Sequence, residues 1–227
     1  MTQTNPWILC LAGAVVGMAG TLYVMSGMLG IEQPVEAAIT SHGEGGEVIE
    51  SFYIGSADGI AVDHDGNMIM GTFPPSIRHF EGEALANTAA FMLKLRDKTG
   101  TVVGFSSELE VFPPEDIVMS DVVWETIWTL VIPGRGSLYL HQQEHSGDLG
   151  PKIVIPMRES GKDWVGDFTT TTTVGPREDG RGVILGGTGE FEGLGGSFVE
   201  IDHVTGFSST GVMTGEFEIR LFKEARS

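Results

Sequence analysis

Hydrophobic and polar residues alternate with a period of two between residues 122 and 132. Trp124, Trp128 and Leu130 share one face of this stretch, and Glu125 lies on the other face. Because successive side chains of a β-strand point to opposite sides, the alternation predicts a strand of about ten residues. Either the two tryptophans or Glu125 then face the interior, and the pattern alone leaves both choices open.

Similar short runs, separated by turn residues, recur along the rest of the chain. They predict strands at residues 48–54, 60–62, 68–71, 89–96, 102–112, 137–143, 152–156, 168–174, 182–186, 197–204 and 212–222. No segment after residue 32 keeps the 3.6-residue period of an amphipathic helix, and residues 83–90 predict at most one or two helical turns. About eight to ten strands in one domain predict an all-β fold, either a sandwich or a closed barrel.

A long apolar stretch precedes the predicted strands. No residue from Pro6 to Ile31 is charged, and about 20 apolar residues are enough to cross a bilayer. Residues 1–31 are therefore predicted to be a signal anchor or a cleaved signal peptide, and residues 32–47 a linker. We expect the rest of the chain to face the periplasm or the exterior, either anchored to the membrane by this helix or secreted after cleavage.

Charge and composition narrow the classes of function. The formal net charge is −18, from 31 acidic and 13 basic residues, which excludes a protein that neutralises nucleic-acid phosphates. The 33 glycines have no collagen period and indicate a β fold with many turns. The single cysteine, Cys10, lies within the apolar stretch, so we expect no internal disulfide and no cysteine-based metal site in the domain.

A glycine-rich motif at residues 183–198 points to a family. It reads Val-Ile-Leu-Gly-Gly-Thr-Gly-Glu-Phe-Glu-Gly-Leu-Gly-Gly-Ser-Phe, and it resembles the signature of the allene oxide cyclase and dirigent superfamily. In that signature a strand enters a glycine-rich turn that ends in Phe. Gly186, Gly187 and Gly189 would permit the tight turn, and Phe191 would close the end of the core. A phosphate-binding loop is not expected, because the Gly-Lys-Ser/Thr ending is absent.

Two further stretches are similar to the same family in order and spacing, namely residues 95–111 and residues 136–141. We therefore assign an allene oxide cyclase-like barrel to residues 83–227 and treat residues 48–82 as an N-terminal extension or as the first barrel strands. The resemblance implies an eight-stranded antiparallel β-barrel with an apolar lumen. It also implies a small hydrophobic ligand and a homodimer or homotrimer.

Two glutamates are the candidate catalytic residues. The position of the family's lumen cysteine falls on Glu110, and Glu108 has the same phase, so the resemblance implies that both face the lumen. A carboxyl group in an apolar tube has a raised pKa and could act as a general acid or base. Simple alternation gives the opposite choice, with Phe105, Leu109 and Val111 inside and both glutamates in solvent.

The predicted ligand-binding wall combines aromatic and polar side chains. It consists of Phe105, Trp124, Trp128, Tyr139 and His141. No metal or cofactor is expected, because His141 and His145 on one strand would have Cα atoms about 13 Å apart. Residues 63–67, Asp-His-Asp-Gly-Asn, suit a hairpin turn better than a calcium loop, because the glycine comes too early and the last acidic ligand is missing.

The sequence supports three functional hypotheses. The first is a barrel that binds a small hydrophobic molecule and guides its cyclisation or isomerisation. The second is a non-catalytic carrier or a dirigent-like stereochemical guide, without acid or base chemistry. The third is a structural module, in which side chains would fill the lumen. No sequence feature decides among the three.

Overall fold

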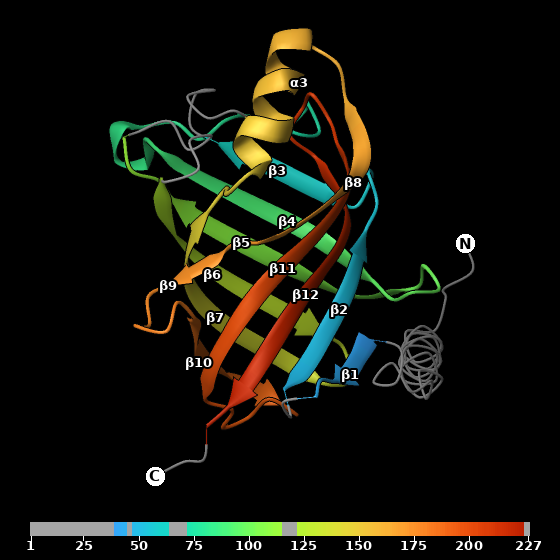
Figure 1. Cartoon of the computed structure of the whole chain (residues 1–227), viewed down its shortest axis with the longest axis vertical. Coiled ribbons are helices and arrows are strands. Elements are labelled where there is room, and N and C mark those ends of the chain that lie inside the picture. The colour runs from blue at the N-terminus through green and yellow to red at the C-terminus, as the bar shows by residue number, and fades with distance from the viewer. Residues whose placement is uncertain (1–38, 45–46, 64–71, 115–121, 225–227) are drawn as a thin grey trace, which may run out of the picture. The chain divides into compact units, whose positions relative to one another are not determined.

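The computed structural model describes residues 39–44, 47–63, 72–114 and 122–224, and these form an almost entirely β structure (Figure 1). Its main feature is a closed barrel of eight antiparallel strands. The strands are β2 (Val48–Ile54), β4 (Thr88–Arg96), β5 (Val102–Val111), β6 (Val123–Ile132), β7 (Gly136–His145), β10 (Gly182–Gly189), β11 (Gly196–Phe207) and β12 (Met213–Lys223). The predicted eight-stranded antiparallel barrel is confirmed.

The barrel strands follow one another around the ring in the order in which they occur along the chain. This is the up-and-down arrangement, and it needs no crossover. β12 pairs with β2 along the whole length of β2, and Tyr53 of β2 pairs with Arg96 of β4. These two pairings close the ring. The first barrel strand therefore lies within residues 48–82.

The ring closes where its first strand is interrupted. β3 (Gly59–Asp63) continues the path of β2 along β4 after a turn at residues 55–58. Asp58 Oδ2 accepts hydrogen bonds from Gly55 N at 2.9 Å and Arg96 Nε at 2.6 Å, and Lys94 Nζ lies 2.9 Å from Oδ1. The bond from Arg96 is the main reason that the pKa of Asp58 lies well below its usual range. This ion pair fixes the turn against β4.

The connection between β7 and β10 carries further elements. They are the π-helix η2 (Gly150–Val154), the helix α3 (Ile155–Ser160), β8 (Trp164–Thr171) and β9 (Thr173–Gly175). β8 pairs with β11, and β9 pairs with β7. β10 lies between β7 and β11 along part of their length, and where β10 has not yet begun, β9 pairs with β7 and β8 pairs with β11. The other short elements are β1 (Thr40–His42), which pairs with β2, and the 3₁₀ helix η1 (Glu83–Leu85), which lies within the segment predicted to form helical turns.

The helices η2 and α3 correct one sequence prediction. The strand expected at residues 152–156 is wrong, because these residues are helical. Ile153, Val154 and Met157 bury one helical face against the end of β11. A short apolar run fits a buried helical turn as well as a strand, so its pattern did not separate the two.

The barrel end opposite α3 is closed by a buried ion-pair network. Arg135, in the turn between β6 and β7, donates two hydrogen bonds of 2.8 Å to the carboxylate of Glu50 and two of 2.7 Å to Glu190. The guanidinium carbon lies 5.1 Å from the ring centroid of Phe191, which is itself buried. Between this network and the other end, side chains fill the lumen. Among the largest fully buried ones are Phe52, Leu130, Leu138, Phe198 and Ile219.

The glycine-rich motif lies where β10 and its turn approach β7 closely. A Cβ atom on Gly187 would lie 2.5 Å from Phe191 Cβ and 2.5 Å from Ser137 O. Gly189 has a φ of 63°, and a Cβ there would lie 2.3 Å from Arg135 O. The motif therefore requires glycine because neighbouring backbone occupies the space of a side chain, and at Gly189 also because of the left-handed conformation.

We expect Gly187→Ala to lower the free energy of unfolding by about 2 to 3 kcal/mol, because backbone on one side and Phe191 on the other leave no room for the methyl group. Gly195→Ala is the matched control, since a Cβ atom there would meet no atom within 4 Å. We expect the control to change stability by about 0.5 kcal/mol or less. Denaturant unfolding of both variants measures the difference, and equal midpoints would contradict this account of the motif.

Residues 1–38 lie outside the described residues, and with them the predicted signal anchor or signal peptide at residues 1–31. The same holds for the strand expected at residues 68–71 and the hairpin turn at Asp65 and Gly66. Among the described residues, none of the helices has the length and apolar character needed to span a bilayer.

Candidate functional site

Five carboxyl groups point into the lumen from three barrel strands. Glu108 and Glu110 lie on β5, Glu144 on β7, and Glu200 and Asp202 on β11. On each strand they occupy positions whose side chains point inward, and the residues directly before and after them point outward. Glu110, Glu144, Glu200 and Asp202 are buried, and Glu108 is partly buried with its side chain in the cavity.

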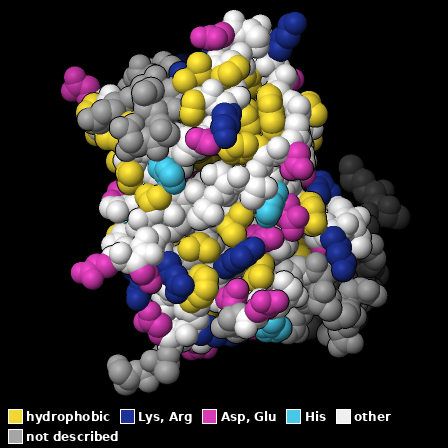
Figure 2. Space-filling model, in the orientation of Figure 1, with side chains coloured by type: hydrophobic (Ala, Val, Ile, Leu, Met, Phe, Trp, Pro, Cys, Tyr) yellow, Lys and Arg dark blue, Asp and Glu magenta, His cyan; other side chains and the backbone are white. Residues whose placement is uncertain are grey.

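These carboxyl groups line a cavity of about 170 Å³. It occupies the end of the lumen that η2 flanks, where Leu149, Gly150 and Val154 contribute to its wall. Figure 2 shows hydrophobic side chains gathered around α3 at this end of the molecule. The rest of the wall is mostly apolar and includes six aromatic side chains, those of Phe91, Phe112, Trp124, Trp128, Phe207 and Phe217. The site is thus an apolar chamber with an acidic group of side chains.

The indole N–H groups of two tryptophans hold the carboxyl groups in place. Trp124 Nε1 donates to Glu110 Oε1 at 2.9 Å, and Trp128 Nε1 donates to Glu200 Oε2 at 2.9 Å. The Trp128 ring stacks on Phe217 with a centroid distance of 5.4 Å. Hydrogen bonds to buried indoles satisfy both partners and fix the carboxyl orientations.

Gln142 links the carboxyl groups of two strands. Its side-chain amide nitrogen donates to Glu144 and to Glu200, and its amide oxygen accepts from Thr173 Oγ1. Thr173 Oγ1 in turn accepts from the backbone N–H of Glu200 at 2.8 Å. Because Thr173 belongs to β9, the inserted strand is part of the network that positions the site.

Burial raises the pKa of these carboxyl groups. It raises the pKa of Glu110 to about 8 and that of Asp202 to about 7. It raises the pKa of Glu108, Glu144 and Glu200 well above the usual range, and repulsion between neighbouring carboxylates adds to the effect. Some of the five therefore carry protons at neutral pH, and protons can be shared among them.

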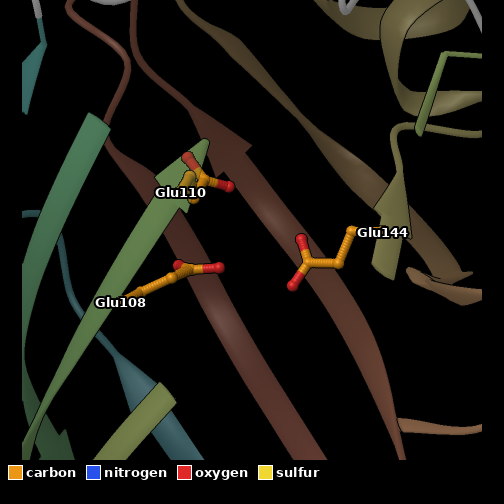
Figure 3. Close-up of side chains that lie close together, drawn as sticks. All are labelled: Glu108, Glu110 and Glu144. Carbon is orange, nitrogen blue, oxygen red and sulfur yellow. The ribbon is translucent and has the colours of Figure 1, made fainter. Parts of the chain in front are cut away.

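Glu108 and Glu110 on β5 and Glu144 on β7, the two strands that flank β6, direct their carboxyl groups toward one another (Figure 3). One oxygen from each of the three lies within 4.8 Å of the others. Such a set could hold a hard cation, but calcium and magnesium require about six oxygen ligands. Glu110 and Glu144 already accept hydrogen bonds from Trp124 and Gln142. The set is better suited to sharing protons than to enclosing a metal ion.

Three residues of the cavity wall have polar atoms without hydrogen-bond partners in the described part of the chain. These atoms are Ser146 Oγ, Thr172 Oγ1 and Asp202 Oδ1, and each residue is at least nine-tenths buried. A buried polar atom without a partner costs about 1 to 3 kcal/mol. The arrangement therefore favours a ligand that supplies polar contacts.

The structure brings four of the sequence-predicted site residues into one cavity. Glu108, Glu110, Trp124 and Trp128 all line it. Of the two alternatives left open by the β6 pattern, the tryptophans face inward and Glu125 faces outward. The catalytic role of the two glutamates and the ligand contacts of the two tryptophans stay predictions.

Three predicted wall residues lie on the outer face of the barrel instead. Phe105, with a relative exposure of 48%, and Tyr139, with 37%, point outward. His141 Nε2 bonds to Glu125 Oε2 at 2.7 Å on the outside. Their assignment to the lumen is wrong. The inward side chains are Ser106 and every second residue from it on β5, and Leu138 and every second residue from it on β7, so the three predicted residues lie at the outward positions between them.

The sequence reasoning missed Glu144, Glu200 and Asp202 as site residues. A signal was present in β11, where Glu200 and Asp202 share the phase of the apolar Phe198 and Val204. An acidic residue in the phase of the buried positions indicates a carboxyl group that points into the core.

No protein-family model matches this chain. No curated protein matches it either. The relation to the allene oxide cyclase and dirigent superfamily therefore stays a proposal.

Proposed function

We propose that the barrel binds a small molecule with an apolar body in its lumen, and that Glu108 and Glu110 move a proton on this molecule to guide its isomerisation or cyclisation. The observation that carries the proposal is the group of carboxyl groups with raised pKa values in an apolar chamber. The proposal includes membership of the allene oxide cyclase and dirigent superfamily. Attachment to the membrane, an external location and a homo-oligomeric state stay predictions.

The size and lining of the cavity support ligand binding. An engineered cavity of about 150 Å³ lined by apolar side chains binds benzene, so a chamber of about 170 Å³ has room for a one-ring compound or one of similar bulk. Its aromatic side chains supply contact area, and the few convergent polar groups would orient the ligand. A purely structural barrel would fill this space with side chains, as the other end of the lumen does.

The pKa values support proton transfer. A general acid or base works best when its pKa lies near the working pH, and burial raises the pKa of Glu110 to about 8. Glu108 lies two residues away on the same strand and is coupled to it by repulsion. One carboxyl group can then remove a proton from the ligand while the other returns a proton to a different atom. Such an isomerisation needs no oxidant and no cofactor.

A non-catalytic carrier is the second candidate, and the hydrogen bonds of the two tryptophans favour it. Trp124 and Trp128 offer the indole donors of the cavity wall, and both already donate to carboxyl groups. An enzyme that used these indoles to stabilise a developing oxyanion would need them directed at the ligand. A carrier has no such need.

Ligand binding is tested by filling the cavity. We expect the purified full chain to carry a small molecule that native mass spectrometry and solvent extraction detect. Leu93→Trp, in the cavity wall, should abolish its recovery, whereas Met92→Trp, on the outer face of the same strand, should retain it. Phe91→Trp provides a smaller change if Leu93→Trp fails to fold. Equal recovery from the wall variants and the control would overturn the proposal, as would recovery of no ligand.

Catalysis is tested with Glu110→Gln, which removes the proton-transfer group and keeps an oxygen that can accept from Trp124. If Glu110 is the acid or base, this variant should bind the extracted ligand within about threefold of wild type and convert it at least about 100-fold more slowly. Chromatography of the ligand after incubation measures conversion. Conversion at the wild-type rate, or none by either protein, would favour the carrier.

A further inference from the structure

The charge of the cavity wall is strongly one-sided. Five carboxyl groups line it, and within the described residues no Lys or Arg side chain does. The one basic side chain in the described wall is that of His145. Outside the lumen, Arg96 pairs with the buried Asp58 and Arg135 with the buried Glu50. The five lumen acids lie together in one cavity without an arginine or lysine in its described wall.

Unpartnered polar atoms form a second and independent feature of the same wall. Asp202 Oδ1, Ser146 Oγ and Thr172 Oγ1 have no hydrogen-bond partner in the described part of the chain. Each can accept a hydrogen bond, and Asp202 Oδ1 also carries negative charge when the group is ionised. A ligand group that has several N–H donors and a positive charge would satisfy these atoms and the carboxyl group together.

The aromatic part of the wall suits the same kind of ligand. Trp124, Trp128 and Phe217 are among its aromatic residues. A cation near the face of an aromatic ring is attracted by the ring, and most strongly when it is shielded from water. The apolar body of the ligand would fill the rest of the chamber.

From these features we propose that the lumen selects an organic cation, namely a protonated amine whose apolar body is about the size of one ring. This inference rests on the proposed ligand-binding function and adds the charge class of the ligand. The ammonium group would lie among the carboxyl groups with Asp202 as a direct partner, and the ring would lie against the aromatic side chains.

A bare divalent cation fits the wall less well. It would need about six oxygen ligands or its own water shell, and most of this wall consists of aromatic and aliphatic side chains that cannot solvate it. Gln142 directs a side-chain N–H toward Glu144 and Glu200, and this N–H would compete with a metal ion for the same oxygens. An ammonium group avoids this conflict because it needs fewer acceptors.

Binding of an amine would be coupled to proton release. The groups that face the ammonium position are Glu108, Glu110, Glu144, Glu200, Asp202 and His145. His203 lies next to Asp202 in sequence and favours its charged form. A bound cation stabilises the ionised form of the carboxyl groups around it, so groups that hold protons in the free protein release them when the amine binds. The affinity for an amine should therefore rise between about pH 5 and pH 8, by up to about tenfold per pH unit for each proton released.

Three probes that share one ring test the charge class. Isothermal titration of the purified full chain with benzylamine, benzyl alcohol and benzoate compares a cation, a neutral molecule and an anion of similar bulk. At neutral pH we expect benzylamine to bind at least about tenfold more tightly than benzyl alcohol, and benzoate to bind more weakly than either. Titration in two buffers of different ionisation enthalpy should reveal the released protons.

Asp202→Asn provides the variant test, because it keeps the size of the side chain and removes the charge. It should weaken benzylamine about tenfold or more and weaken benzyl alcohol by a smaller factor, because only the amine loses the charge interaction. Glu192→Gln makes the same type of change at an exposed glutamate and should alter neither affinity. Circular dichroism and binding of benzyl alcohol show that Asp202→Asn is folded.

Each result bears on a different claim. Equal or tighter binding of benzyl alcohol or benzoate would overturn the inference, while the proposed ligand-binding function would stand. If calcium or magnesium binds, its binding is lost in Asp202→Asn and benzylamine does not bind, the inference is overturned in favour of a metal site. If none of the three ring probes binds, the inference fails, and the Leu93→Trp comparison decides separately whether the barrel binds any ligand.

Discussion

Replacing Arg135 by methionine is expected to lower the free energy of unfolding by about 3 to 5 kcal/mol and the melting temperature by about 10 °C. The side chain is 7% exposed, and it holds Glu50, which is 1% exposed, through two hydrogen bonds of 2.8 Å. Without the guanidinium, Thr40 Oγ1, at 3.0 Å, is the side-chain donor left to the Glu50 carboxylate among the described residues. A buried charge without a counter-ion is one of the largest single penalties in a fold.

The double variant Arg135→Met with Glu50→Gln separates the charge effect from the loss of packing. It removes the unpaired carboxylate, so it should recover more than half of the lost stability. Arg78→Met is the control at an exposed ion pair, with 88% of the Arg78 side chain accessible, and it should change stability by about 0.5 kcal/mol or less. Thermal unfolding followed by circular dichroism measures all three. An Arg135→Met variant as stable as Arg78→Met would show that the network does not stabilise this end of the barrel.

The sequence carried enough information for the all-β class of fold, because the strands and turns of an antiparallel sheet can be predicted from local patterns. Strands with period-two alternation and glycine-containing turns account for β4 to β7 and for β11 and β12. The closure of the barrel could not be predicted from these local patterns. It depends on the contact of β2 with β12 and on the pairing of Tyr53 with Arg96, and no local pattern encodes pairing between strands so distant along the chain.

Which face of each strand points inward was harder to predict. On β6 the outer face carries Val123 and Ile127 and the inner face carries Thr126, so both faces mix apolar and polar residues. On β7 the outer Tyr139 is more apolar than the inner Gln142. A lumen that contains polar groups removes the contrast on which binary patterning depends. The outward position of Phe105 was therefore not predictable from alternation, whereas on β7 the apolar Leu138 and Leu140 mark the phase opposite to Tyr139 and His141 as the inward one.

The clustering of the five acidic residues could be recognised only once the fold was known. Glu108 and Glu110 were proposed from a resemblance to family positions, but Glu144, Glu200 and Asp202 come from strands far apart in the sequence. The barrel brings all five to one end because β5, β7 and β11 present the same phase at the same level. The sequence could show that acids outnumber bases, but it could not show that five of them share one chamber.

This concentration of acids predicts that the ligand-free protein loses stability as the pH rises. Between about pH 5 and pH 8.5 we expect the free energy of unfolding to fall by about 4 kcal/mol or more, and the melting temperature by about 10 °C. In the unfolded chain the pKa values of Glu and Asp are about 4.3 and 3.9, whereas in the fold burial raises that of Glu110 to about 8 and that of Asp202 to about 7.

The direction follows from proton binding. Each raised carboxyl group binds its proton more tightly in the folded than in the unfolded chain, so folding takes up protons between the two pKa values. The corresponding stability is complete below about pH 4 and is lost as the pH rises through the folded pKa values. Asp58 acts in the opposite direction, because its pKa is lowered, but its contribution is lost only in acid. The range above pH 5 therefore reports on the lumen.

Glu110→Gln tests the origin of this loss. It removes one buried acid and keeps an acceptor for the Trp124 indole, so it should stabilise the protein by about 2 kcal/mol at pH 8.5 and change little at pH 5. Glu192→Gln, at an exposed site, should leave the pH profile as in wild type. Thermal unfolding of wild type and both variants across this range provides the comparison. A wild-type melting temperature that stays constant or rises from pH 5 to pH 8.5 would mean that the lumen acids are ionised at little cost, and the proton-transfer proposal would lose its physical basis.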